Sequence, residues 1–87
     1  MADVSIASLS AAQAAGTAAI RPANPMRDVI MINPPIDCTL TLAPGVTTGM
    51  PLFGGVPNSF EGQLCPSNAL YIVGLGAGVA VSIWEIA

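Results

Sequence analysis

Residues 69–86 read Ala69-Leu-Tyr-Ile-Val-Gly-Leu-Gly-Ala-Gly-Val-Ala-Val-Ser-Ile-Trp-Glu-Ile86. Two runs in this stretch, 69–73 and 79–86, are rich in the β-branched and aromatic residues that are typical of strands. The glycines between them can adopt the positive φ that a connecting loop needs. We therefore predict two strands here, joined as a β-hairpin.

The last run alternates between two kinds of side chain. Because successive side chains of a strand point to opposite faces, Val79, Val81 and Ile83 should face a core. Ala80, Ser82 and Trp84 should then lie on the other face. That second face suits contact with a partner, and Trp84 is its candidate anchor because Trp is enriched in interfaces.

A membrane-spanning helix is the alternative interpretation of the same stretch. The chain is uncharged from Gly62 to Trp84, and 74–78 contains a GxxxG spacing that allows close helix packing. However, the continuous apolar part covers only 69–84, it includes three glycines, and no Lys or Arg flanks it. A span needs about 20 apolar residues, usually with cationic flanks. We therefore favour strands, and a helix near 69–84 stays as the alternative.

The preceding sequence, from Met26 onward, consists of short β-rich runs separated by Pro and Gly. This pattern is typical of an all-β domain, a small β-sandwich or a jelly-roll-like barrel, which we expect over 26–87. Pro51 restricts its run to a sheet edge because proline cannot donate to the ladder. The expected strands of this part are 27–33, 38–42, 50–53 and 58–64.

Residues 1–25 differ from the rest because they are rich in Ala and contain few large side chains. Ser10 and Gln13 have the spacing of a capping box, so a short helix is possible after Ser10. Isolated helices of this length are marginal in water. We therefore expect an extended N-terminal arm that becomes ordered only against neighbouring subunits.

Charged residues are scarce. They make up 8% of the 87 residues, whereas 53% are hydrophobic, and the net charge is −3. A domain this small cannot bury so much apolar surface, so the surplus should lie in contacts between subunits. Arg27 should form an ion pair at the strand end or between subunits. The candidate contact residues are Val4, Ile6, Leu9, Ile20, Arg27 and Trp84.

The same composition argues against several classes of function. Nucleic-acid binding requires clustered Lys and Arg, and this chain has two scattered Arg. With neither His nor Lys, it lacks most groups used in catalysis, so we expect no enzyme, no catalytic residues and no cofactor. Two thiols without His do not complete a zinc site. Cys38 and Cys65 are expected to be reduced, since no secretory signal is visible; a secreted adhesion module, which would need their disulfide, is a further alternative.

The order of the pieces is similar to a known group of proteins. The series Arg27-Asp-Val-Ile-Met-Ile-Asn33, Val46-Thr-Thr-Gly-Met-Pro-Leu52, Ala69-Leu-Tyr-Ile-Val-Gly74 and Val79-Ala-Val-Ser-Ile-Trp-Glu85 resembles the small β-sandwich proteins encoded among the head genes of tailed bacteriophages. The resemblance covers about 26–87 and leaves the Ala-rich arm unmatched. Pro34-Pro35 replaces the polar turn of that pattern.

This resemblance implies a structural virion protein. The expected role is capsid decoration, in which the protein binds the outer capsid surface and stabilises the head through apolar contacts. The implied partners are the major capsid protein and further copies of this chain in a homo-oligomer, for which a trimer is one option. The implied location is the virion, after synthesis in the host cytoplasm.

Overall fold

Pro and Gly divide the chain into short elements, as the sequence predicts. The computed structural model describes the backbone of residues 2–86 and the side chains of residues 6–86. The elements are, in order, β1 (Ala2–Ile6), α1 (Ala11–Ala14), β2 (Val29–Asn33), β3 (Cys38–Thr41), β4 (Met50–Leu52), β5 (Asn58–Glu61), the 3-10 turn η1 (Gly62–Leu64), β6 (Tyr71–Val73) and β7 (Val81–Ile86).

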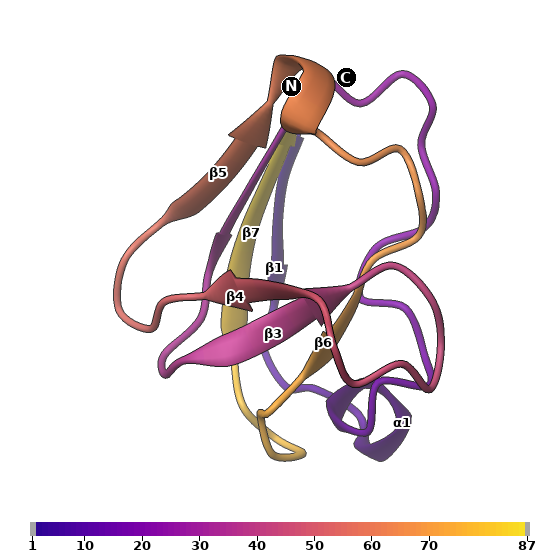
Figure 1. Ribbon diagram of the computed structural model, residues 1–87. Coiled ribbons are helices and arrows are strands. Elements are labelled where there is room, and N and C mark those ends of the chain that lie inside the picture. The colour runs from indigo at the N-terminus through magenta and orange to yellow at the C-terminus, as the bar shows by residue number, and fades with distance from the viewer. Residues whose placement is uncertain (1, 87) are drawn as a thin grey trace.

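The strands form two antiparallel sheets. The larger sheet has the order β1-β7-β2-β5, and the smaller has the order β4-β3-β6. In Figure 1 the strands of the smaller sheet run across those of the larger one. Pro51 lies in β4, at an edge, where its missing N–H is tolerated. The all-β prediction is therefore confirmed.

The alternation predicted for the last strand is also confirmed. Val81 and Ile83 are buried, whereas Ser82, Trp84 and Ile86 are exposed. The register places Ile83 of β7 opposite Ile32 of β2, and both are fully buried. Cross-strand pairs of this kind stabilise a sheet because their side chains lie about 5 Å apart.

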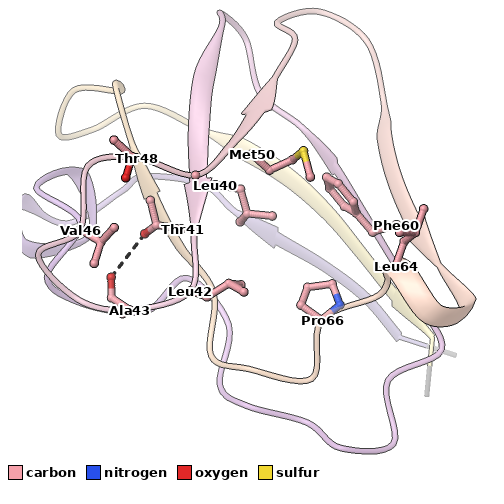
Figure 2. A pocket seen from close by; sticks show the side chains of 11 residues that line it. Leu40, Thr41, Leu42, Ala43, Val46, Thr48, Met50, Phe60, Leu64 and Pro66 are labelled. Carbon is pink, nitrogen blue, oxygen red and sulfur yellow. Dashed lines mark hydrogen bonds between the residues drawn. The ribbon is translucent and has the colours of Figure 1, made fainter.

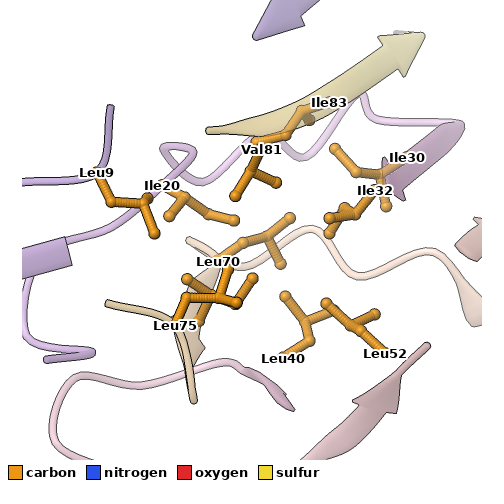
Figure 3. Packing of buried hydrophobic residues seen from close by; sticks show 11 residues of the cluster. Leu9, Ile20, Ile30, Ile32, Leu40, Leu52, Leu70, Leu75, Val81 and Ile83 are labelled. Atoms are coloured by element: carbon orange, nitrogen blue, oxygen red, sulfur yellow. The ribbon is translucent and has the colours of Figure 1, made fainter. Parts of the chain in front are cut away.

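The core lies between the two sheets and takes side chains from both. Figure 3 shows Ile30, Ile32, Val81 and Ile83 of the larger sheet on one side and Leu40 and Leu52 of the smaller sheet on the other. Leu70, Ile72 and Leu75 complete the cluster, together with two residues that precede β2. One hydrophobic cluster therefore holds the two sheets together.

The predicted hairpin of 69–73 and 79–86 is wrong. β6 pairs with β3 in the smaller sheet, and β7 pairs with β1 and β2 in the larger one. Gly74 and Gly78, with φ of +102° and +85°, turn the chain between the sheets. Leu75 is buried between them at 6% exposure. A tight hairpin would have kept Leu75 out of the core, so its burial favours the crossing.

Residues 1–25 also differ from the expected arm. β1 pairs with β7 over its whole length, and Leu9 and Ile20 belong to the core. Backbone bonds fix both: Leu9 N–H donates to Val79 O at 2.9 Å, and Ile20 N–H to Leu70 O at 2.7 Å. A small domain has little apolar surface to bury in its core. Burial of these two large side chains therefore stabilises the fold more than their exposure in an arm would. Leu9 and Ile20 therefore share one core with the strands that follow.

A short helix after Ser10, which was the less favoured of the two expectations for this segment, is present as α1. Ser10 caps it, with Gln13 N–H donating to Ser10 Oγ at 3.1 Å and Ser10 N–H donating to Gln13 Oε1 at 2.9 Å. The capping box is thus confirmed. The helix packs on β6 of the same chain.

We expect Ile32→Ala to lower the free energy of unfolding by about 2–5 kcal/mol, because it leaves a cavity in the core. Urea unfolding followed by the fluorescence of Trp84 measures this. Ile36→Ala is the matched control, since Ile36 is 57% exposed; its loss should stay below about 0.5 kcal/mol. Equal losses for the two variants would contradict the placement of the core.

Candidate functional site

Arg27, just before β2, donates four side-chain hydrogen bonds. Its side chain is fully buried, and its Nε lies 2.9 Å from Glu85 Oε1 in β7. Its other nitrogens donate to the carbonyl oxygens of Pro66, Asn68 and Pro22 at 2.7–3.0 Å. Arg27 therefore joins the N-terminal segment, the loop before β6 and the last strand.

Glu85 receives two further donors. Asn24 Nδ2 donates to its Oε2 at 3.0 Å, and Arg21 Nε lies 3.4 Å from its Oε1. Burial raises the pKa of Glu85, but the hydrogen bonds from Asn24, Arg21 and Arg27 outweigh burial and leave this pKa below its ordinary value. The ion pair predicted for Arg27 is confirmed, within one chain. We define the Arg27 cluster as Arg21, Asn24, Arg27 and Glu85.

Three of the predicted contact residues are not on the surface. Leu9, Ile20 and Arg27 are only 2–6% exposed. Leu9 and Ile20 fill the core, and Arg27 forms an ion pair with Glu85. Their predicted role as surface contact residues is therefore corrected. Ile6 is half-buried against the core. Val4 lies opposite Ile83 in the register of β1, and its side chain lies outside the described residues.

Trp84 remains on the surface and does not stand alone. It is 42% exposed, and Ile86 beside it is 40% exposed. The register places Trp84 opposite Met31 and Ile86 opposite Val29 of β2. These four apolar residues therefore form one patch on the side of the larger sheet that faces away from the core, which we call the outer face.

A second apolar surface lies where β4 and β5 separate. It is a groove with a volume of about 390 Å³. Figure 2 shows Leu40 and Leu42 at its centre, Met50 beside Phe60 on one side, and Leu64 and Pro66 nearby. Its only polar side chains belong to Thr41 and Thr48, and Thr41 Oγ1 donates to Ala43 O at 3.4 Å. No ionisable side chain lines the groove.

The described residues can be compared with the requirements of a metal site and of a reactive thiol. No three acidic or Cys side chains among them come together as a metal site. Cys38 and Cys65 are free thiols. Burial, with a smaller effect of Asp37, raises the pKa of Cys38 to about 11, which keeps the thiol protonated and unreactive at neutral pH. Within residues 2–86, no helix has the length and apolar character to cross a membrane.

The most exposed charges of the described residues are negative, and Arg21 is only partly exposed. Asp28, Asp37 and Glu61 are exposed. Both arginines are held by Glu85 instead. The surface therefore consists of apolar patches with a few carboxylates between them.

A scan against models of protein families, a search of curated proteins and a search of solved structures found no match to this chain.

Two features of these surfaces were missed in the sequence. Glu85 follows Val81 and Ile83 at the inward positions of the last run, so the alternation could have identified it as a buried partner for Arg27. The groove had no comparable signal. Its residues come from β3, β4, β5 and the loops between them, and only the packing of the two sheets brings them together.

We expect Arg27→Met to lower the free energy of unfolding by about 3–5 kcal/mol, since Glu85 would lose its main partner in a buried site. Chemical denaturation at neutral pH measures this loss. Arg21→Met is the matched control: its contact with Glu85 is longer and its side chain is 21% exposed, so the loss should stay below about 1 kcal/mol. Similar losses for the two variants would contradict the central role of Arg27.

The lowered pKa of Glu85 makes stability depend on pH. Its stabilising effect should be complete above the pKa of an unfolded Glu, about 4.3, and should disappear as the pH falls through the folded value. The difference in unfolding free energy between the unmodified chain and Glu85→Gln should therefore shrink below about pH 4.3. Denaturation curves at a series of pH values test this, and a difference that is unchanged at low pH would contradict it.

Proposed function

We propose that this chain is a structural virion protein that binds the outer surface of a bacteriophage capsid as a small β-sandwich. The observation that carries this proposal is the outer face, where Trp84, Ile86, Met31 and Val29 lie together without a covering element. An exposed aromatic anchor with apolar neighbours is typical of a protein interface. The virion is proposed as the location because the succession of sequence runs along the chain resembles that of phage head proteins.

The scarcity of charge supports binding to protein. Among the described side chains, ten large hydrophobic ones are substantially exposed, including Met26, Phe53 and Leu64. Exposed apolar surface of this kind promotes association in water. Burial of apolar area yields about 25 cal/mol per Å², and a standard interface covers about 800 Å² on each partner.

The proposed partners are the major capsid protein and further copies of this chain. When many copies bind to a symmetric shell, the modest affinities of the single contacts combine into a high overall avidity. In this role the protein would be made in the host cytoplasm and would join the completed head. It would stabilise the shell by linking neighbouring capsid subunits through apolar contacts.

The test is mass spectrometry of purified particles from the virus that encodes the chain. We expect the protein in the particles, in a copy number that follows the symmetry of the shell. Trp84→Ser should deplete it at least about tenfold, because a central Trp commonly contributes 2 kcal/mol or more to an interface.

Phe53→Ser is the matched control for this test, since Phe53 is 59% exposed and lies outside the outer face. It should leave the copy number unchanged. Absence of the unmodified protein from particles would refute the function. Equal depletion by the two variants would refute the role of the outer face.

A further inference from the structure

The two sheets leave a gap between their edge strands on two sides of the molecule, and these two gaps are covered differently. On one side, β1 and β6 are the sheet edges, and the N-terminal segment covers the gap with Leu9, Ile20 and α1. On the other side, β4 and β5 are the edges. Residues 53–57 join these two strands, which then diverge into different sheets (Figure 1). The groove of about 390 Å³ opens where they diverge.

The groove has room for large apolar side chains. A cavity of about 150 Å³ with apolar walls already binds benzene. The groove is more than twice this size, and Leu42, Met50 and Leu64 on its walls are 48–79% exposed. Because no ionisable side chain lines the groove, water molecules inside it bind to no charged group. An apolar side chain from outside would therefore replace this water favourably.

The edge of β5 offers backbone hydrogen bonds beside the groove. Gly62 N–H donates to Asp28 O at 3.3 Å. With the antiparallel register of β2 and β5, this bond means that Phe60 exchanges its backbone bonds with Ile30. Backbone groups alternate along such a ladder, so those of Ser59 and Glu61 point away from β2. The side chain of Phe60 meanwhile lines the groove.

The charge at this edge is negative. Glu61 is exposed at the end of β5, and Asp28 is exposed at the neighbouring end of β2. The ion pairs of the described side chains join only Glu85 to Arg21 and Arg27, so neither carboxylate is neutralised by them. A basic side chain of a partner would therefore find an acidic edge next to an apolar groove.

We propose that the edge of β5 and the groove bind an extended segment of a partner protein that carries a large apolar residue next to Lys or Arg. The segment adds a strand to β5 and bonds to the backbone of Ser59 and Glu61. Its residue opposite Phe60 enters the groove, and the next residue lies beside Glu61, because side chains alternate along a strand. This site goes beyond the proposed function, since it uses the groove and the backbone edge of β5, which do not belong to the outer face. Ser59 and Glu61 adjoin that face at Met31 and Val29.

The test is a titration of the ¹⁵N-labelled chain with the peptide acetyl-Thr-Arg-Leu-Arg-Thr-amide, followed by NMR. Its symmetric sequence can pair with β5 in either direction. We expect saturable shifts of the amide signals of Ser59 and Glu61 with a millimolar dissociation constant. The peptide with Ala in place of Leu should bind at least tenfold more weakly. The peptide with Glu in place of both Arg should bind about fivefold more weakly, in keeping with exposed ion pairs.

Two variants of the chain separate the backbone and charge contributions. Ser59→Pro removes an N–H that points away from β2 and should abolish binding, whereas Ser59→Thr keeps this N–H and should bind within about twofold of the unmodified chain. If Ser59→Pro does not give a folded spectrum, Glu61→Gln serves instead. It should remove most of the preference for the Arg peptide over the Glu peptide.

Four results would overturn the proposal. Two of them concern the place of binding: no saturable shift at Ser59 and Glu61, or shifts confined to the outer face. The third is equal binding of the Arg and Glu peptides. The fourth is a set of shifts at β5 that appear without peptide and depend on protein concentration, which would identify a second copy as the occupant. None of them bears on the particle test of the proposed function. The two proposals can therefore fail independently.

Discussion

The buried contact between Arg27 and Glu85 is the constraint on which the rest of the structure depends. Arg27 makes its other bonds to the backbone carbonyls of Pro22, Pro66 and Asn68, so one guanidinium holds the segment before β2, the loop before β6 and the last strand. A buried ion pair stabilises only when all its polar atoms are bonded. Among the described side chains no buried polar atom lacks a partner, so this condition is met.

This arrangement also shapes the surface. Since both arginines are held by Glu85, the exposed charges of the described side chains are carboxylates only. The core uses Leu9 and Ile20 from the Ala-rich segment, which leaves other large apolar residues outside. Two apolar surfaces result, the flat outer face and the groove. The flat face suits a broad contact with a protein wall, and the groove suits single side chains.

The sequence predicted the elements better than their arrangement. The edge position of Pro51, the capping box of Ser10 and the two faces of the last strand depend on local patterns, and all are present. The expected strands are present too, but the run 58–64 is a strand only as far as Glu61 and then forms η1, and β1 was not predicted. The hairpin was wrong because a loop of five residues permits either a hairpin or a crossing. Only the burial of Leu75 between the sheets distinguishes them. The arm is not seen, because Leu9 and Ile20, two of the few large apolar side chains of residues 1–25, fill the core of their own chain.

By itself the sequence determined that the chain forms short strands, that Trp84 lies opposite the core face of its strand, and that few charges cover the surface. These properties follow from side-chain alternation and composition, which need no knowledge of distant contacts. The tertiary structure alone decided which strands share a sheet, which arginine is buried and where the groove opens. Each of these depends on residues far apart in the chain, such as Arg27 and Glu85, whose contact forms only when the two sheets enclose the core.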